Sequence, residues 1–242
     1  MKNSLKFFAA AGLLLLGSLT AYNAALHTEY VRGSYKDPLH NYNSLALRDF
    51  NTLAVPSAGA MQMRVEAGPY GVFVSKDAAQ YVRITQQGAG LTVALAFPEK
   101  EAYLGTGDVV IIRCPRLSAL TAGTAYTVAG QSKTTAKLDH SNSKQLLVQG
   151  FAQDSLRLSQ DHTAHVVLAG NHLSRLLAVV GGTPGSTAQL DLSSTNRIDT
   201  SDLRVEEHGK LMATNLALPA RHWHFSDSAR VELSGRALEG LR

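Results

Sequence analysis

Residue types used in hydrolytic catalysis occur side by side at Asp139, His140 and Ser141. A catalytic triad needs its nucleophile, base and acid to face one another, which three adjacent residues do not readily achieve. The segment is therefore interpreted as a polar turn. The chain contains no nucleophile elbow, phosphate-binding loop, zinc-protease helix or dinucleotide-binding motif. Accordingly, we assign no catalytic and no cofactor-binding residue.

Histidines suggest a second kind of chemistry, metal binding. His222 and His224 flank Trp223, so in a strand both imidazoles would lie on one face. With His162 and His165 on a nearby strand they would form a ladder able to take up Zn²⁺ or Cu²⁺. The alternative is an ordinary polar surface, which we favour, and no metal-binding residue is assigned.

Aspartates in the second half of the chain are the nearest candidates for acid–base catalysis. Asp191 lies between Leu190 and Leu192 and should point outward from a strand, whereas Asp199 and Asp202 resemble turn residues. A carbohydrate-active enzyme would need such carboxylates to converge. The sequence does not establish convergence, so this activity is kept as the alternative function.

The single cysteine, Cys114, follows an apolar segment and precedes Pro115. One cysteine excludes a disulfide scaffold and a cysteine-rich zinc module. The strand context predicts a small buried residue, although Arg113 beside it leaves a reactive thiol or an intermolecular disulfide as an alternative.

Composition excludes several further classes of protein. Of the 242 residues, 45% are hydrophobic and 17% are charged, and the formal net charge is only +4. The apolar fraction indicates a folded chain rather than a disordered one, and the small charge gives no electrostatic footprint for nucleic acid.

The N-terminus has the pattern of an export signal. Lys2 and Lys6 precede an apolar stretch from Phe7 to Leu26, and the basic flank should stay in the cytoplasm. Residues 1–26 are thus predicted to be either a signal peptide or an uncleaved anchor, and residues 27–49 a juxtamembrane linker. The chain would then be exported to the periplasm or cell envelope, with residues 7–26 either removed or anchoring it in the inner membrane.

From residue 50 onward the hydrophobic pattern has a period of two. Apolar residues alternate with polar ones over 61–66 and 91–97, with turn residues at the boundaries, as expected for strands with one buried face. The continuous apolar run 109–112 predicts a strand that is covered on both faces. Residues 50–115 are therefore expected to form an N-terminal strand-rich cap.

A unit of about twenty residues then recurs over 116–242. Its leading positions are Leu156, Leu177, Leu203 and Trp223. Stacked units would let each strand pair with the next and bury a continuous apolar ladder. We therefore predict an all-β fold, a parallel β-helix (β-solenoid) over 50–242, with an antiparallel sheet or sandwich as the alternative. Four residues should then stack as one inward column: Leu158, Val179, Val205 and Phe225.

These features together resemble the family named putative auto-transporter adhesin, head GIN domain, of Bacteroidetes envelopes. The resemblance is carried by the segments 50–55, 65–72 and 115–120 and by the recurrent Ala-x-Val-x-Leu-x-Gly units. It covers residues 50 to about 240, and the segment 121–124 departs from the glycine-rich loops often found there. The resemblance implies a β-helical, non-enzymatic envelope protein.

The predicted function is therefore the presentation of a surface, for adhesion, for glycan or protein binding, or for envelope architecture. The expected partners are an extracellular polysaccharide or an envelope protein, neighbouring copies of the chain, and the membrane through the N-terminal segment, with no nucleic acid and no cofactor. Outward polar residues would form the surface: Arg157, His165, Gln189, Arg204, His224, Arg230 and Glu232.

Overall fold

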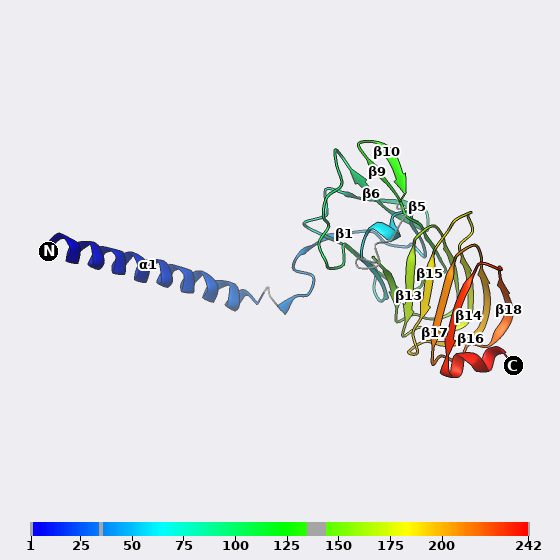
Figure 1. Cartoon of the computed structure of the whole chain (residues 1–242). Coiled ribbons are helices and arrows are strands. Elements are labelled where there is room, and N and C mark those ends of the chain that lie inside the picture. Colours follow the sequence, from blue (N-terminus) through cyan, green and yellow to red (C-terminus); the bar gives the residue numbers. More distant parts are fainter. Residues whose placement is uncertain (1, 34–35, 135–143, 242) are drawn as a thin grey trace. The chain divides into compact units, whose positions relative to one another are not determined.

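The computed structural model describes residues 2–33, 36–134 and 144–241 of the chain. It divides into two compact units, Met1–Tyr42 and Asn43–Arg242, which are described separately. Figure 1 labels the main elements.

The first unit consists mainly of one long helix, α1 (Lys2–Arg32). Its segment Lys6–Val31 is long and apolar enough to cross a membrane, and none of it is buried. At 1.5 Å per residue, 26 residues extend about 39 Å, more than the roughly 30 Å of a hydrocarbon core. The helix therefore fits a signal sequence or a membrane anchor, and it extends beyond residue 26.

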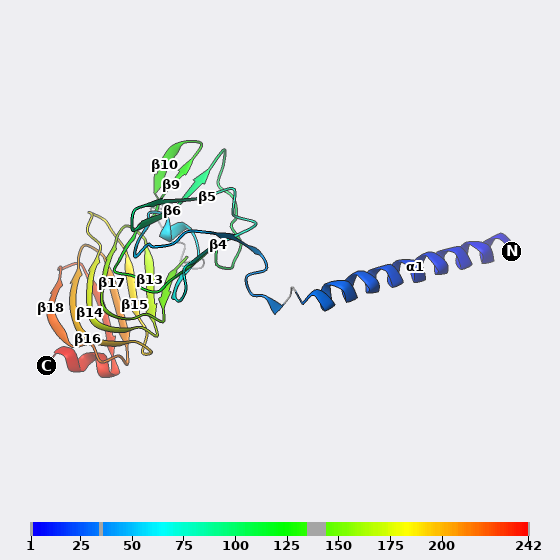
Figure 2. The ribbon, with the colours of Figure 1, turned by 180° about the vertical axis from the view of Figure 1, so that it is seen from behind.

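The second unit consists of two large sheets, which Figures 1 and 2 show from opposite sides. One sheet has nine strands, in the order β1 (Tyr42–Leu45), β4 (Gly71–Ser75), β7 (Val110–Cys114), β3 (Met63–Ala67), β11 (Leu146–Gln149), β13 (His165–Ala169), β15 (Gln189–Leu192), β17 (Lys210–Thr214) and β19 (Arg230–Ser234). The other has ten, in the order β10 (Gln131–Thr134), β9 (Ala125–Val128), β6 (Gly90–Phe97), β2 (Thr52–Val55), β8 (Ala119–Ala122), β12 (Ala152–Gln160), β14 (His172–Val180), β16 (Arg197–Val205) and β18 (Ala220–Phe225). A further strand, β5 (Val82–Gln87), pairs with β6, and two short 3₁₀ helices are η2 (Ala58–Ala60) and η4 (Gly235–Leu241).

The prediction of a parallel β-helix is wrong. Both sheets are mixed: β4–β7, β5–β6 and β9–β10 are antiparallel, whereas the strands from β11 to β19 pair in parallel within each sheet. The strands that the structure describes form two separate sheets and no closed solenoid. Period-two patterning identifies the buried face of a strand but does not determine the direction in which neighbours pair. Tight turns decide that direction here: Ala129 and Gly130 both have positive φ, 50° and 77°, which joins β9 to β10 as a two-residue hairpin.

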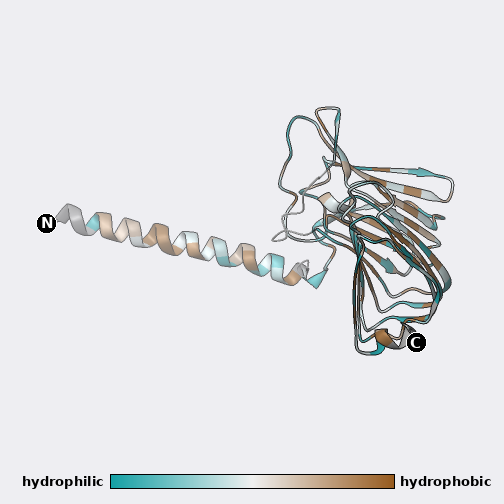
Figure 3. Cartoon of the chain, turned by 45° about the vertical axis from the view of Figure 1, so that its right-hand side comes forward, coloured by the Kyte–Doolittle hydropathy of each residue, from teal (hydrophilic) through white to brown (hydrophobic). Residues whose placement is uncertain are grey.

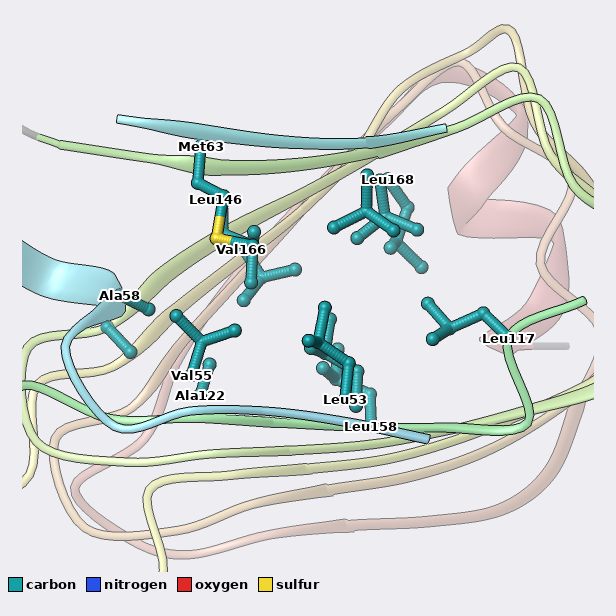
Figure 4. Packing of buried hydrophobic residues seen from close by; sticks show 14 of the residues in the cluster. Leu53, Val55, Ala58, Met63, Leu117, Ala122, Leu146, Leu158, Val166 and Leu168 are labelled. Carbon is teal, nitrogen blue, oxygen red and sulfur yellow. The ribbon is translucent and has the colours of Figure 1, made fainter. Parts of the chain in front are cut away.

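The inner faces of the two sheets share one hydrophobic core. In Figure 4, Met63, Leu146 and Val166 project from the nine-stranded sheet toward Leu53 and Leu158 of the ten-stranded sheet. All five are at most 3% exposed. Each such side chain contributes about 1.5–3 kcal/mol when buried, so this core is the main stabilising feature of the unit. The alternation of hydrophobic and hydrophilic colour along the strands follows from it (Figure 3).

The predicted inward column is right for Val205 and Phe225, which are aligned, but wrong for Leu158 and Val179, which are not in line with them. Leu158 is aligned with Ala178, Leu203 and Trp223, so these four residues form one inward column. Val179 is aligned instead with Ser159 and Arg204 and lies on the outer face. Because side chains alternate along a strand, an error of one residue moves a side chain to the opposite face.

Two buried asparagine side chains form hydrogen bonds to backbone groups of neighbouring segments at one edge of the core. Asn171 is buried, and its Oδ1 accepts a hydrogen bond from the Phe151 amide at 3.0 Å. Its Nδ2 donates to the Val148 carbonyl at 3.0 Å and to Asn196 Oδ1 at 3.1 Å. Asn196, also buried, continues the ladder by donating to the Leu168 carbonyl at 2.6 Å. These bonds satisfy backbone groups that would otherwise lie unpaired inside the protein.

Candidate functional site

The outer face of the ten-stranded sheet carries two neighbouring rows of side chains where β12, β14, β16 and β18 lie side by side. In one row Arg157, Leu177, Asp202 and His222 are aligned, and in the other Ser159, Val179, Arg204 and His224. Parallel pairing places equivalent residues one strand apart, so each row runs across the strands. The sheet thus brings together residues that are more than sixty positions apart in the chain.

A hollow of about 430 Å³ lies between and beside these rows. We call it the outer groove and define it by Arg157, Leu177, Val179, Asp202, Arg204, His222 and His224. Its volume is within the range of small-ligand sites. Leu177 and Val179 are half-buried apolar side chains on a face where polar residues would be expected, and Arg157, Arg204, His222 and His224 are exposed around them.

A charge network fixes the acidic side of the outer groove. Asp202 accepts a hydrogen bond from Arg175 Nε at 2.7 Å on Oδ2, and its Oδ1 lies 2.8 Å from His222 Nδ1. The hydrogen bond with His222, together with the bonding and charge of Arg175, lowers the pKa of the Asp202 carboxyl despite some desolvation. Asp202 is therefore ionised and held by two partners at neutral pH.

The arginines of the outer groove differ in their partners. Arg204 forms an ion pair with Glu206. Arg157 is exposed and has no ion-pair partner within the described part of the chain. An unpaired guanidinium beside an apolar surface is available to bind a carboxylate, with which it can form two parallel hydrogen bonds.

A larger hollow, of about 700 Å³, lies on the nine-stranded sheet beside Glu66, Arg113 and Gln149. Its charged groups bind one another. Arg113 Nε donates to Glu66 Oε1 at 2.6 Å, Gln149 Nε2 donates to Glu66 Oε2 at 3.3 Å, and the Arg113 guanidinium lies 5.4 Å from the centroid of the Phe73 ring. Burial acts to raise the pKa of Glu66, but hydrogen bonding and charge from Arg113 lower it overall. With its charges paired internally, this hollow is a weaker candidate for ligand binding than the outer groove.

The three candidate catalytic aspartates have separate partners. Asp191 Oδ2 lies 2.8 Å from His165 Nε2 on the nine-stranded sheet, whereas Asp199 pairs with Arg197 at 3.3 Å and Asp202 with Arg175 and His222 on the ten-stranded sheet. The expectation that Asp199 and Asp202 lie in a turn is wrong, because both belong to β16. The structure therefore does not bring these carboxylates together as an acid–base pair.

The structure also separates the histidines of the proposed ladder. His222 and His224 share the outer face of β18, but His165 lies in β13 of the other sheet, and His162 precedes it in a turn with φ 57°. Among the described residues no group of three or more histidine, cysteine or acidic side chains is placed to hold a metal ion.

Two further sequence candidates have different outcomes. Cys114 is fully buried, and its burial raises the pKa of the thiol to about 12, as expected of a structural residue. Asp139, His140 and Ser141 lie outside the described residues.

Sequence reasoning identified Arg157, Arg204 and His224 as outward residues but missed the apolar side chains of Leu177 and Val179 between them. The sequence did contain an indication of this apolar surface. From Leu176 to Val180 the sequence is uninterruptedly apolar, although β14 belongs to a sheet with one face open to solvent. An apolar residue on that open face indicates a contact surface rather than a core position.

Comparison with known proteins gives solved structures only. No protein-family model matches the chain, and no curated protein matches it in sequence. A putative adhesin from Parabacteroides distasonis shares 14% identity with it, over 79% of this chain and 75% of that chain, with a TM-score of 0.48. A putative adhesin from Bacteroides fragilis shares 9% identity over 80% and 91%, with a TM-score of 0.46, and one from Parabacteroides merdae shares 12% over 81% and 92%, with a TM-score of 0.34. All three of these solved structures are named putative adhesins, and no family model supports the head GIN name.

Proposed function

We propose that the chain is a non-enzymatic protein of the cell envelope that binds an acidic polysaccharide through the outer groove. The observation that carries the proposal is the unpaired, exposed Arg157 beside the half-buried outward side chains of Leu177 and Val179. A sugar acid has matching chemistry, because its carboxylate can bind a guanidinium and its ring has an apolar face that can rest on aliphatic side chains.

The charges around the groove favour an anionic ligand. The negative charge of Asp202 is matched by Arg175, and that of Glu206 is matched by Arg204. Arg157 therefore contributes an excess positive charge. Such attraction is screened by salt, so binding should weaken as ionic strength rises.

A carbohydrate-active enzyme remains the alternative function, but the carboxylates do not favour it. General acid–base hydrolysis uses two carboxyl groups that flank one bond, with one of them holding a proton. Asp202 has a lowered pKa and two basic partners, while the neighbouring Asp199 is engaged by Arg197. This arrangement supports binding rather than cleavage.

Export to the envelope is supported by α1, whose length and composition fit a signal sequence or an anchor. In that location the second unit would meet polysaccharides outside the cytoplasm.

Affinity electrophoresis of the full chain in mild detergent tests the proposal. Gels containing polygalacturonate, a carboxylated polymer, should retard the protein, and gels containing neutral dextran should not. Arg157→Gln should abolish most of the retardation. Arg48→Gln removes the same charge from another exposed arginine, which lies outside the outer groove and whose side chain has no partner among the described residues. This control should leave the retardation unchanged. Equal effects of the two substitutions would show that net charge alone causes retention and would reject the groove.

The length of the polymer in the same samples distinguishes the alternative function, a carbohydrate-active enzyme, from the proposed binding protein. Shortening of the polymer by the wild-type protein that is lost in Asp199→Ala or Asp202→Ala would establish catalysis and overturn the proposal.

A further inference from the structure

The C-terminal ends of both sheets are unfinished. The strands β18 and β19 are the last of their sheets, and among the described residues each pairs with one neighbour only, β16 and β17 respectively. The free edge of such a strand presents unpaired N–H and C=O groups that can pair with another chain.

The apolar core continues to this end without being closed. The inward residues Leu203 and Leu211 of the preceding strands are at most 2% exposed. Their aligned successors Trp223 and Val231 are only half-buried, and so are Phe225 and Leu233, although η4 follows β19 and buries Ala237. Trp223 and Phe225 pack against each other with ring centroids 5.9 Å apart. A further layer is needed to bury these side chains as fully as those before them.

The opposite end of the ten-stranded sheet is built differently. Its last strand, β10, is the polar segment Gln131–Thr134, and all four residues are exposed. Lys133 there lies 3.9 Å from Glu101. Short, polar edge strands resist pairing with other chains. Within the ten-stranded sheet, the apolar C-terminal end therefore has no matching strand at the other end of a second copy, but it does match the same end of that copy.

The charges on β19 fit such a symmetric arrangement. If two copies of β19 pair in antiparallel fashion with Val231 at the two-fold axis, Arg230 of each lies opposite Glu232 of the other. Arg230 is exposed and has no ion-pair partner within the described ranges, while Glu232 pairs with Lys210 at 2.9 Å and is 47% exposed. Opposite charges directly across an antiparallel pair are favourable, and like charges are not.

We infer that two copies of the chain associate end to end through β18 and β19, with antiparallel β19 strands centred on Val231. This two-fold contact joins the two apolar ends and gives each free edge a partner, so the assembly closes as a dimer.

Sedimentation velocity of the full chain in detergent, at concentrations from about 1 to 100 μM, tests the inference. The wild-type protein should sediment as a dimer at the upper concentrations. Arg230→Glu and Glu232→Arg should each place like charges across the contact and weaken association about tenfold, while the combination of both should restore it to within about threefold of wild type.

Lys133→Glu changes a charge at the polar end and is the matched control, which should leave association unchanged. Circular dichroism of each variant would establish that it is folded. A monomer at every concentration would overturn the inference. A dimer whose association does not change in Arg230→Glu, in Glu232→Arg or in their combination would also overturn it, because the contact would then lie elsewhere. The same holds if the combination of Arg230→Glu and Glu232→Arg fails to restore association.

Discussion

Gln160 is a polar side chain in an apolar position, and its replacement by leucine should stabilise the protein. It is 1% exposed, and neither its amide nitrogen nor its amide oxygen has a hydrogen-bond partner within the described part of the chain. In register it lies between Ala122 and Val180, both buried and apolar. A buried polar group without a partner costs about 1–3 kcal/mol.

Leucine removes this cost with little change in volume, so Gln160→Leu should raise the free energy of unfolding by about 1–3 kcal/mol. For a domain of this size each kcal/mol corresponds to about 2–4 °C in melting temperature. Urea unfolding followed by far-UV circular dichroism would measure the change.

Gln153 provides the matched control within the same strand. Its side chain donates to the carbonyls of Leu117 and Ser155 and accepts from the Leu117 amide at 3.0 Å. Gln153→Leu should therefore lower the free energy of unfolding, opposite in sign to Gln160→Leu. If Gln160→Leu is also destabilising, the amide has a partner such as an internal water, and the reasoning is refuted.

Three further predictions concern single residues. Asn171→Leu leaves the Phe151 amide and the Val148 carbonyl without their side-chain partner and should cost about 2–4 kcal/mol in urea unfolding, so a loss below about 1 kcal/mol would contradict the role of the asparagine ladder. The pKa of Glu66 is lowered from 4.5, so its ionised form stabilises the fold at higher pH, and this contribution is lost as the pH falls below 4.5 through the folded-state pKa. Urea unfolding at a series of pH values should therefore show that the stability difference between wild type and Glu66→Gln shrinks over that range. A stability difference that is independent of pH would contradict this role of Glu66. Cys114, with a thiol pKa raised to about 12, should not react with a thiol reagent at pH 8 until the protein is unfolded, whereas rapid labelling of the native protein would show that the site opens.

The sequence predicted individual strands well, because burial leaves a direct trace in residue type. The alternating segments 61–66 and 91–97 correspond to β3 and β6. The apolar run 109–112 is buried on both faces, with Val109 and Ile111 each 1% exposed. Cys114 was expected to be buried and is.

The direction of strand pairing was not predictable in the same way. The antiparallel hairpins depend on the conformation of two residues, as at Ala129 and Gly130, and an alternating pattern continues unchanged through either kind of pairing. Register failed for a related reason. Val179 and Val180 are equally apolar, and only the pairing with Arg204 and Val205 shows which of them faces outward.

The apolar run from Leu176 to Val180 was a sequence signal for the outer groove, but the two rows of the groove depend on the exact alignment between strands. The recurring unit of about twenty residues predicts that the segments with Arg157, Leu177 and His222 are neighbours, but only the observed register shows that these three residues share one row. The misplacement of Asp202 in a turn hid its partners Arg175 and His222 as well.

Isothermal titration calorimetry of the full chain with a hexamer of galacturonic acid tests the proposed function most directly. Mass spectrometry after the titration then measures the length of the hexamer. The account predicts saturable binding that weakens with added salt, is lost in Arg157→Gln, and leaves the hexamer intact. Absence of binding heat at low salt, or recovery of shorter oligomers, would contradict it.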